Sequence, residues 1–293
     1  MDNNNSLKSI VGVDVGGTKI EAGRILDNQI VAKQKVDTQA HLSQPEVISN
    51  ICKAIEQVID HSTYSIGVGV PGFVDIDNGI VRAVTNIPSW KNVPLQQELE
   101  EYFSIPVNIN NDANCFAIGE KYYGKAKNFK SFVGITLGTG LGSGIIINDK
   151  LFTGSHNGSG EFGSIPYLGS NYEYYCSSSF FQNVYKTTGT EVYEKALKND
   201  PYALNIMSEF GKHIGNTIKA IMLSIDPEAV VIGGSIAGSF DLFKESMWET
   251  IRTFPNKEVV ESFRVEKSEL ESAILGAAAL TFQYSNQKQV VKV

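Results

Sequence analysis

Cysteine is scarce in this chain, and long apolar runs are missing from it. The 293 residues include only Cys52, Cys115 and Cys176, which are too widely spaced for a disulfide framework or a paired metal knuckle. We therefore expect reduced, buried thiols. No stretch approaches the roughly 18 apolar residues of a membrane-spanning helix, and the N-terminus lacks a basic segment followed by an apolar core. These features predict a cytoplasmic protein without a membrane partner.

Positive charge is also in short supply. The chain has 25 Lys and Arg against 32 Asp and Glu, which gives a formal net charge of −7. Proteins that bind nucleic acid concentrate Lys and Arg to neutralise phosphates, so this balance argues against such a partner. The 42% hydrophobic content over 293 residues is sufficient for two domains, each with its own core.

Hydrophobic periodicity predicts an α/β protein whose two halves begin in the same way. Residues 8–36 have the pattern of three strands in an antiparallel meander, followed by helical spacing, a strand, a second helix and a strand at residues 106–110. The second half starts again with a strand, a glycine turn and two more strands over residues 131–155. This similarity suggests a duplicated structural unit.

Long helical patterns follow in the second half, at residues 202–224 and 241–252 around an apolar strand, and a last apolar helix covers residues 272–283. We expect a smaller N-terminal α/β domain over residues 1–112, joined by the C-terminal helix at about 272–288, and a larger C-terminal α/β domain over residues 113–271.

A short motif with the residues of a phosphate site lies at the end of the first strand. Asp14 is followed by a tight turn at Gly16 and Gly17 and by two hydrogen-bond donors, Thr18 and Lys19. Glycine allows backbone N–H groups to approach phosphate oxygens, and the carboxylate can hold Mg²⁺ through its waters. A plain hairpin with a Gly-Gly turn explains the same residues equally well.

A second glycine-rich segment reads TLGTGLGSG, with glycine at positions 138, 140, 142 and 144. Loss of side chains weakens an interior strand, so we infer that a ligand comes close to this backbone. A phosphate loop with Thr139 as a donor to the terminal phosphate accounts for the pattern. A bend or bulge is the alternative, although four glycines exceed what a bend needs.

Polar residues end the strand at residues 106–110. Asn111 and Asp112 stand between this strand and a predicted helix, at the strand end where open α/β sheets bind ligands. There Asp112 could deprotonate an attacking hydroxyl while Asn111 bonds neighbouring hydroxyls. The alternative is that Asp112 is a helix N-cap, a role compatible with catalysis.

Three further motifs have a functional and a simpler interpretation. Glu161 follows a loop rich in glycine and serine, where it could bind ring hydroxyls or simply be a surface residue. The segment GVGVPG at 67–72 matches a dinucleotide fingerprint but lacks the helix that such a site requires. The segment GEKYYGKA at 119–126 lacks the Ser or Thr of a P-loop, and Gly124 is better explained as the end of a helix.

Taken together, the ordered segments VGVDVGGTKI, GVGVPGFVD, TNIPSW, INNDANCFAIGE, GITLGTGLGSGIIINDKLFTGSHNGSGEFG, DPEAVVIGGSIA and SAILGAAAL resemble the ROK family of bacterial sugar kinases and sugar-responsive repressors. The resemblance extends over nearly the whole chain. It implies a two-domain actin-like ATPase (ribonuclease H-like) fold with an interdomain cleft, Mg-ATP as phosphoryl donor and a hexose hydroxyl as acceptor, commonly that on C6. It also implies a homodimer.

The resemblance assigns Asp112 as the catalytic base and Asp14 as the residue that holds Mg²⁺ through water. The sugar contacts that it implies are Asn86, Asn111, Glu161 and, in the sugar-side loop, Gly72. The expected nucleotide contacts are Asp14, Gly16, Gly17, Thr18, Lys19, Gly138, Thr139, Gly140, Gly233 and Gly234.

The sequence departs from the family in the region that usually binds zinc. Ser164 stands where a histidine contacts both zinc and sugar, and the cysteine-rich stretch is replaced by LGSNYEYYCSSSFF. By position this leaves Ser178 where a sugar-binding Glu would stand. We expect no structural zinc, because one candidate ligand, Cys176, cannot complete a tetrahedral site. An apolar cluster of aromatic residues is expected to hold the loop instead: Phe162, Tyr167, Tyr172, Tyr174, Tyr175, Phe180 and Phe181.

Several functions of the same fold remain open at the level of the sequence. Glucose is the first candidate acceptor, ahead of fructose, mannose, N-acetylated hexosamines and β-glucosides. A sugar-sensing transcriptional regulator would need a helix-turn-helix segment ahead of the first strand, and only nine residues precede Ile10. A non-catalytic sugar-binding module would not consume ATP. Retention of both glycine segments and of Asp112 favours the kinase.

Overall fold

The chain folds into two compact units, and the computed structural model describes residues 8–84, 86–270 and 272–290, the side chains of 285–290 excepted. The first unit comprises Met1–Gly124, Thr153–Gly158 and Leu270–Val293, and the second comprises Lys125–Phe152 and Ser159–Glu269. The first boundary therefore falls at Gly124 and not at the expected residue 112. The reason is that α3 (Asp112–Tyr122) packs along α9 (Ala273–Val290), within the first unit.

A five-stranded sheet forms the centre of the first unit. It consists of β1 (Ser9–Val15), β2 (Lys19–Leu26), β3 (Gln29–Asp37), β4 (Thr63–Val70) and β8 (Val107–Asn111), in the order β3-β2-β1-β4-β8. The first three strands form the predicted antiparallel meander, while β1, β4 and β8 are parallel. Strands β1 and β4 are almost continuously apolar because helices cover both of their faces.

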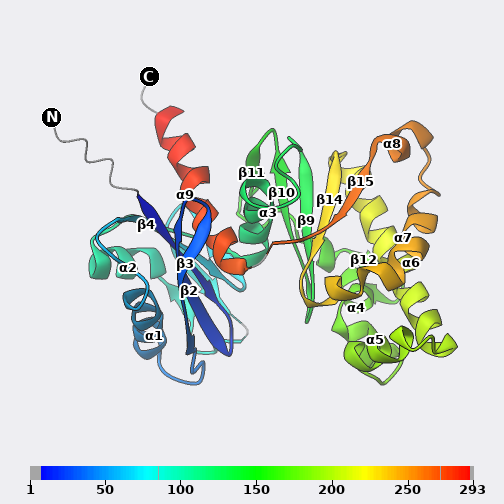
Figure 1. Ribbon diagram of the computed structural model, residues 1–293, viewed down its shortest axis with the longest axis horizontal. Helices are drawn as coiled ribbons and strands as arrows, with labels where there is room; N and C mark the ends of the chain where they lie inside the picture. Colours follow the sequence, from blue (N-terminus) through cyan, green and yellow to red (C-terminus); the bar gives the residue numbers. More distant parts are fainter. Residues whose placement is uncertain (1–7, 85, 271, 291–293) are drawn as a thin grey trace. The chain divides into compact units, whose positions relative to one another are not determined.

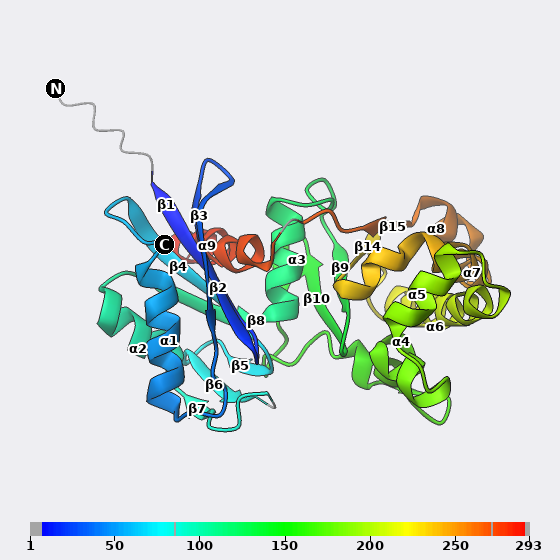
Figure 2. The same ribbon diagram turned by 60° about the horizontal axis from the view of Figure 1, so that its bottom comes forward.

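The two faces of this sheet are covered differently. Helix α1 (Gln44–Glu56) and α2 (Leu95–Phe103) share a core with the valines at positions 11, 13 and 15 of β1, and α9 covers the opposite face (Figures 1 and 2). Helix α9 lies so close that a Cβ at Gly12 or Gly67 would collide with its backbone. Glycine in these two strands is therefore explained by the close approach of a helix rich in alanine.

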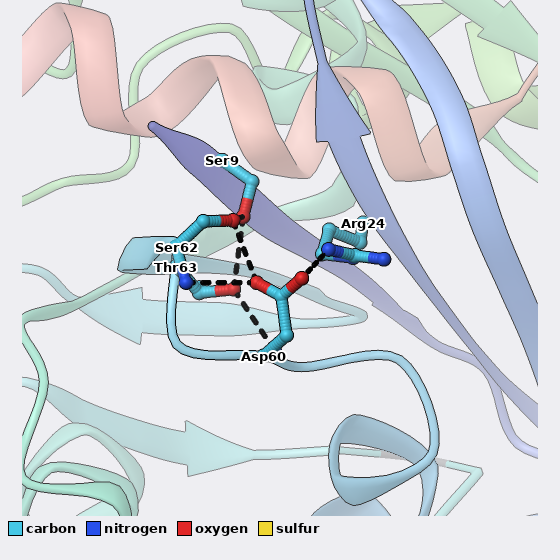
Figure 3. A network of polar contacts seen from close by, with 5 residues as sticks. All are labelled: Ser9, Arg24, Asp60, Ser62 and Thr63. Atoms are coloured by element: carbon cyan, nitrogen blue, oxygen red, sulfur yellow. Dashed lines mark hydrogen bonds and ion pairs between the residues drawn. The ribbon is translucent and has the colours of Figure 1, made fainter. Parts of the chain in front are cut away.

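A network of polar side chains lies at the amino ends of β1 and β4 (Figure 3). The hydroxyl of Ser9 is 2.8 Å from that of Ser62 and 3.0 Å from that of Thr63. Asp60 accepts hydrogen bonds from the Ser62 N–H, at 2.9 Å, and from the Ser62 hydroxyl, at 2.6 Å, and it forms an ion pair with Arg24 of β2. This network joins the start of β4 to β1 and β2, at the edge of the sheet opposite to the carboxyl ends of β1 and β4.

A small antiparallel sheet that was not predicted from the sequence follows β4 in the first unit. Its strands are β5 (Phe73–Asp75), β6 (Ile80–Ala83) and β7 (Lys91–Val93), in the order β5-β6-β7. Asp75 bonds the side chain of Asn78 at 3.0 Å and forms an ion pair with Arg82, so the turn between β5 and β6 is tied at its base.

The second unit repeats the strand order of the first. Its sheet has the order β11-β10-β9-β14-β15, from β9 (Phe132–Leu137), β10 (Leu141–Ile147), β11 (Lys150–Phe152), β14 (Ala229–Gly233) and β15 (Arg264–Lys267). Here too a three-stranded antiparallel meander is extended by two parallel strands. This equivalence agrees with the duplicated unit suggested by the sequence.

Helices cover the second sheet and carry most of its core. They are α5 (Gly189–Leu197), α6 (Pro201–Ile225), α7 (Phe240–Ile251) and α8 (Lys257–Ser262). Helix α6 begins with an Asp200 side-chain cap and Pro in its first turn, and it ends at Asp226 in the left-handed conformation. No helix in the described residues is long and apolar enough to cross a membrane.

The predicted aromatic cluster holds the loop that follows Glu161. Tyr167 of the short hairpin β12 (Pro166–Tyr167) and β13 (Ser170–Asn171) stacks on Tyr172 of α4 (Tyr172–Cys176), with ring centroids 4.4 Å apart. Its hydroxyl is 3.1 Å from Nδ1 of His213, a residue of α6 whose pKa is lowered by burial. Packing and these bonds therefore join the loop to α6. Across the described part of the chain, no group of three or more His, Cys, Asp or Glu could hold a metal.

Candidate functional site

The candidate site of the first unit lies where three parallel strands end. In the sheet register, Asp14 of β1 is level with Gly69 of β4, and Gly69 is level with Asn110 of β8. Asp112 follows directly as the first residue of α3. The carboxyl ends of parallel strands are where open α/β sheets bind ligands, and this edge brings two carboxylates together.

The Asp14 carboxyl has a raised pKa because it is buried and lies near other negative charges. Burial is the largest cause that raises the pKa of its carboxyl to about 6, and the charges of Asp112 and Glu21 act in the same direction. Lys19 and Lys33 oppose the shift, but each of them is bonded to Glu21, at 2.7 and 3.1 Å. An acidic pair of this kind suits a divalent cation, whose charge would favour the ionised form of Asp14.

The first glycine turn is tightly built. The Gly16 N–H donates to the carbonyl of Lys19 at 2.8 Å, and the hydroxyl of Thr38 donates to the Gly16 carbonyl at 2.6 Å. A Cβ at Gly17 would lie 2.7 Å from Cβ of the exposed Asn86, so Asn86 lies against the turn.

The two predicted donors after this turn differ in their surroundings. Thr18 is exposed and its carbonyl accepts the N–H of Thr38 at 3.0 Å. Lys19 is also exposed, but its ammonium is held on the sheet surface by Glu21. The Thr18 hydroxyl therefore remains a candidate donor to a ligand, while the ammonium of Lys19 is paired with Glu21 on the same strand.

Asn111 is the N-cap of α3, whereas the sequence left that role open for Asp112. The Asn111 side chain accepts the Ala113 N–H at 2.9 Å and donates to the carbonyl of Gly72 at 2.8 Å. Asp112 is exposed, and its carboxylate accepts the same N–H at 2.8 Å. This arrangement fixes the Asp112 backbone and presents its side chain at the strand edge.

One residue that supports this edge from below was not predicted from the sequence. Asn110 is fully buried, and its side-chain oxygen accepts the Asn111 N–H at 2.8 Å and the Asn114 amide at 2.9 Å. Its amide donates to the Tyr284 hydroxyl of α9 at 3.1 Å. A buried amide with three bonds positions the strand end on which Asp112 depends. Its presence in the run Asn-Asn-Asp was the available signal.

The second unit carries the other glycine turn, between β9 and β10. The Gly138 N–H donates to the Gly140 carbonyl at 3.0 Å, and the Ser178 N–H donates to the Gly138 carbonyl at 2.8 Å. Ser178 also donates its hydroxyl to the carbonyl of Thr139, at 3.4 Å. Ser178 therefore holds the glycine turn.

A pocket of about 420 Å³ opens beside this turn, entirely within the second unit. Its lining consists of Gly138, Thr139, Ser178, Phe181, Gln182, Thr188, Gly189, Thr190, Tyr193, Ser235, Ile236, Gly238 and Ser239. None of these described lining residues is charged, and many carry hydroxyls. Such a lining suits the uncharged base and ribose of a nucleotide.

The expected contacts Gly233 and Gly234 lie next to the pocket lining and are not part of it. Gly233 ends β14. Gly234 has φ +85°, a conformation that favours glycine, and a Cβ there would lie 2.4 Å from the Leu137 carbonyl oxygen. The pair turns the chain so that Ser235 and Ile236 reach the pocket.

Glu161 and Ser164 are both exposed, at the two ends of a turn that contains the 3₁₀ helix Phe162–Ser164. Helix α4 packs against that turn, and Glu173 on α4 accepts the Leu141 N–H at 3.0 Å beside the glycine turn. The sequence placed Ser178 at the position of a sugar-binding carboxylate. In the structure Ser178 lies in the pocket lining, and the carboxylate of Glu173 accepts a backbone hydrogen bond beside the glycine turn.

Comparison with known proteins gives one consistent result. The ROK family model matches residues 10–284. The glucokinase of Thermotoga maritima is 29% identical, over 92% of this chain and 96% of its own length. The N-acetyl-D-glucosamine kinase of Vibrio cholerae is 29% identical, over 80% of this chain and 87% of its own length.

A solved structure agrees with these relatives. The ROK family glucokinase from Streptomyces griseus in complex with glucose and AMPPNP is 27% identical, with a TM-score of 0.79, over 93% of this chain and 98% of that chain. The two sheets of equal strand order are those of the two-domain actin-like ATPase fold, as the sequence predicted. The chain belongs to the ROK family.

Proposed function

We propose that this protein is an ATP-dependent sugar kinase that transfers the γ-phosphoryl group of Mg-ATP to a hexose hydroxyl, with the C6 hydroxyl of glucose as the first candidate. The observation that carries the proposal is the acidic strand edge. There Asp112 is exposed beside Asn111, the N-cap of α3, and the charge of Asp112 contributes to the raised pKa of Asp14. Phosphoryl transfer requires a base or orienting carboxylate and a metal-binding carboxylate in this relation.

In the proposed reaction the sugar hydroxyl oxygen attacks the γ-phosphorus, the bond from that phosphorus to the β-phosphate oxygen breaks, and ADP leaves. Asp112 receives the hydroxyl proton. Asn111 and Gly72 fix the backbone around the acceptor hydroxyl through their hydrogen bond. Asp14 would hold Mg²⁺ through water, and that ion supplies charge neutralisation for the phosphates.

The donor side of the proposal rests on the second unit. The uncharged pocket beside Gly138 and Thr139 would take the adenosine, and Thr139 is exposed at the tip of the turn as a donor to the terminal phosphate. Glu161 and Glu173 would bind ring hydroxyls of the sugar through charge-assisted hydrogen bonds. Ser164 remains a candidate contact on the same turn.

A second acceptor is favoured by one of the relatives. The Vibrio cholerae N-acetyl-D-glucosamine kinase has the same 29% identity to this chain as the Thermotoga glucokinase, over a smaller share of the chain. An N-acetylated hexosamine is therefore the principal alternative acceptor.

The decisive experiment is a coupled ADP-release assay over glucose, fructose, mannose, N-acetylated hexosamines and β-glucosides, run on wild type and on Asp112→Asn. The variant keeps the shape but not the proton acceptor, so kcat should fall roughly 10²- to 10⁴-fold while sugar affinity persists. Asp27→Asn, in the exposed β2–β3 turn, is the matched control and should retain full activity. No ADP release with any sugar would refute the kinase, and more than half of wild-type kcat in Asp112→Asn would refute Asp112 as the base.

A further inference from the structure

One exposed aromatic ring stands at the candidate site without an assigned role. Phe73 is the first residue of β5, and its side chain is 41% exposed. The residue before it, Gly72, accepts the hydrogen bond from Asn111, which itself precedes Asp112. The ring is therefore attached to the same backbone contact that fixes the strand edge of the proposed base.

Two of the positions next to this ring carry small residues. Its cross-strand partner on β6 is the exposed Ala83, and a Cβ added to Gly158 would lie 3.5 Å from Cε2 of Phe73. Gly158 belongs to the segment Thr153–Gly158, which is part of the first unit. Neither neighbour has a side chain large enough to cover the ring, which agrees with its 41% exposure and leaves an apolar shelf on the residue that follows Gly72.

The β5–β6 hairpin holds the shelf in place. Gly72 has φ +84°, and a Cβ there would lie 2.5 Å from the Ala83 carbonyl, so only glycine fits the turn that precedes Phe73. The other end of β5 is tied by Asp75 to Asn78 and Arg82. A ring on a hairpin fixed at both ends loses little conformational entropy when a ligand covers it.

Exposed apolar side chains are common singly and need no explanation on an ordinary surface. Tyr102 of α2 is such a case, because it lies near the amino end of β8 and bonds Glu56 of α1 at 2.6 Å. Phe73 differs because its backbone neighbour is bonded to the residue beside the proposed base. Binding sites combine a few placed polar groups with apolar and aromatic walls, and Phe73 supplies the apolar part.

We propose that Phe73 is the floor of an apolar subsite that receives a substituent of the acceptor sugar, so that the proposed site takes substituted hexoses as well as plain glucose. The substituent is an uncharged apolar group, either the methyl of an acetamido group or an aromatic aglycone. This inference rests on the proposed sugar-kinase function and specifies the acceptor of that same site.

The test measures sugar binding by calorimetry without ATP, for glucose, N-acetylglucosamine and phenyl β-glucoside, on wild type, Phe73→Ala, Phe73→Leu and the control Tyr102→Ala. Loss of the ring should weaken binding of one substituted sugar roughly five- to tenfold, as expected for an aromatic contact. Glucose binding should change less than about twofold, Phe73→Leu should be intermediate, and Tyr102→Ala should match wild type.

The identity of the weakened sugar distinguishes the acetamido group from the aglycone. Equal loss for all three sugars, no loss for any of them, or a wild type that binds none would overturn the subsite. The ADP-release assay is independent of this result: a protein that binds substituted sugar through Phe73 but consumes no ATP would refute the kinase and leave the subsite standing.

Discussion

The two edges of the first sheet differ in whether their carboxylates have a positively charged partner. At the amino edge, Asp60 faces Arg24 and accepts two hydrogen bonds from Ser62, so its negative charge is matched (Figure 3). At the carboxyl edge, burial and the nearby charges of Asp112 and Glu21 together raise the pKa of Asp14 to about 6. The paired charge at the amino edge therefore stabilises the fold. The carboxylates at the carboxyl edge repel one another, and a bound cation would reduce that repulsion.

The largest effect should come from removing the charge of Asp14 at the carboxyl edge. Asp14→Asn should lower kcat for sugar phosphorylation at least about 100-fold, because a metal-held charge stabilises the transition state by several kcal/mol. The ligand-free variant should nevertheless be more stable than wild type at pH 8, by about 1–2 kcal/mol after allowance for solvent screening.

Both halves of this prediction can be measured on the same preparations. Turnover is followed at saturating sugar and Mg-ATP, and unfolding is followed in urea without ligands. Full activity in Asp14→Asn would show that Asp14 does not hold the metal. A loss of stability at pH 8 would show that the charge of Asp14 does not destabilise the folded protein.

The pH dependence sharpens the comparison. A raised carboxyl pKa means that the folded state holds the proton more tightly, so the contribution to stability is present at low pH and is lost as pH rises through about 6. The ionised form is the one that binds metal, so kcat/KM for Mg-ATP should decline about tenfold per pH unit below 6. A profile of kcat/KM from pH 5 to 8 checks this. A flat profile over that range would contradict a titrating Asp14.

The amino edge should show the opposite behaviour, with an effect on stability alone. Asp60→Ala leaves Arg24 without its partner and removes bonds to Ser62, so the free energy of unfolding should fall by about 1–3 kcal/mol while kcat stays within twofold of wild type. The control is Asp241→Ala, which removes an exposed ion pair with Lys244 and should cost less than about 0.5 kcal/mol. Equal losses in the two variants would mean that the amino-edge network does not hold the sheet.

Local patterns explain which elements the sequence predicted well. The meander, the parallel strands and the long helices have strong periodicity, and the glycine turns at Gly16 and Gly138 lie between strands as expected. The strands β5 to β7 were missed because they are only three or four residues long, which is too short to show a clear alternation of apolar and polar residues. Helix α3 was assigned to the other side of the domain boundary because nothing local shows that α9 packs against it.

The candidate site was predictable as a set of residues but not as a set of contacts. Asp14, Asn111 and Asp112 were identified because polar residues at strand ends are conspicuous, and the structure brings them to one edge. Ser178 was assigned by its position in the altered loop, and its role as a sugar contact stays a prediction. Glu173 was not assigned as a sugar contact, because nothing in the sequence shows that its carboxylate lies beside the glycine turn.

The packing of α9 has a consequence for how the protein is synthesised. Helix α9 follows all of the other described elements in the sequence, yet it covers one face of the first sheet, and its Tyr284 bonds Asn110 at the end of β8. All residues of the second unit, Lys125–Phe152 with Ser159–Glu269, are synthesised before α9. The first unit therefore cannot complete its fold until after the residues of the second have been made, and a chain cut before Ala273 would lack the helix that supports β8.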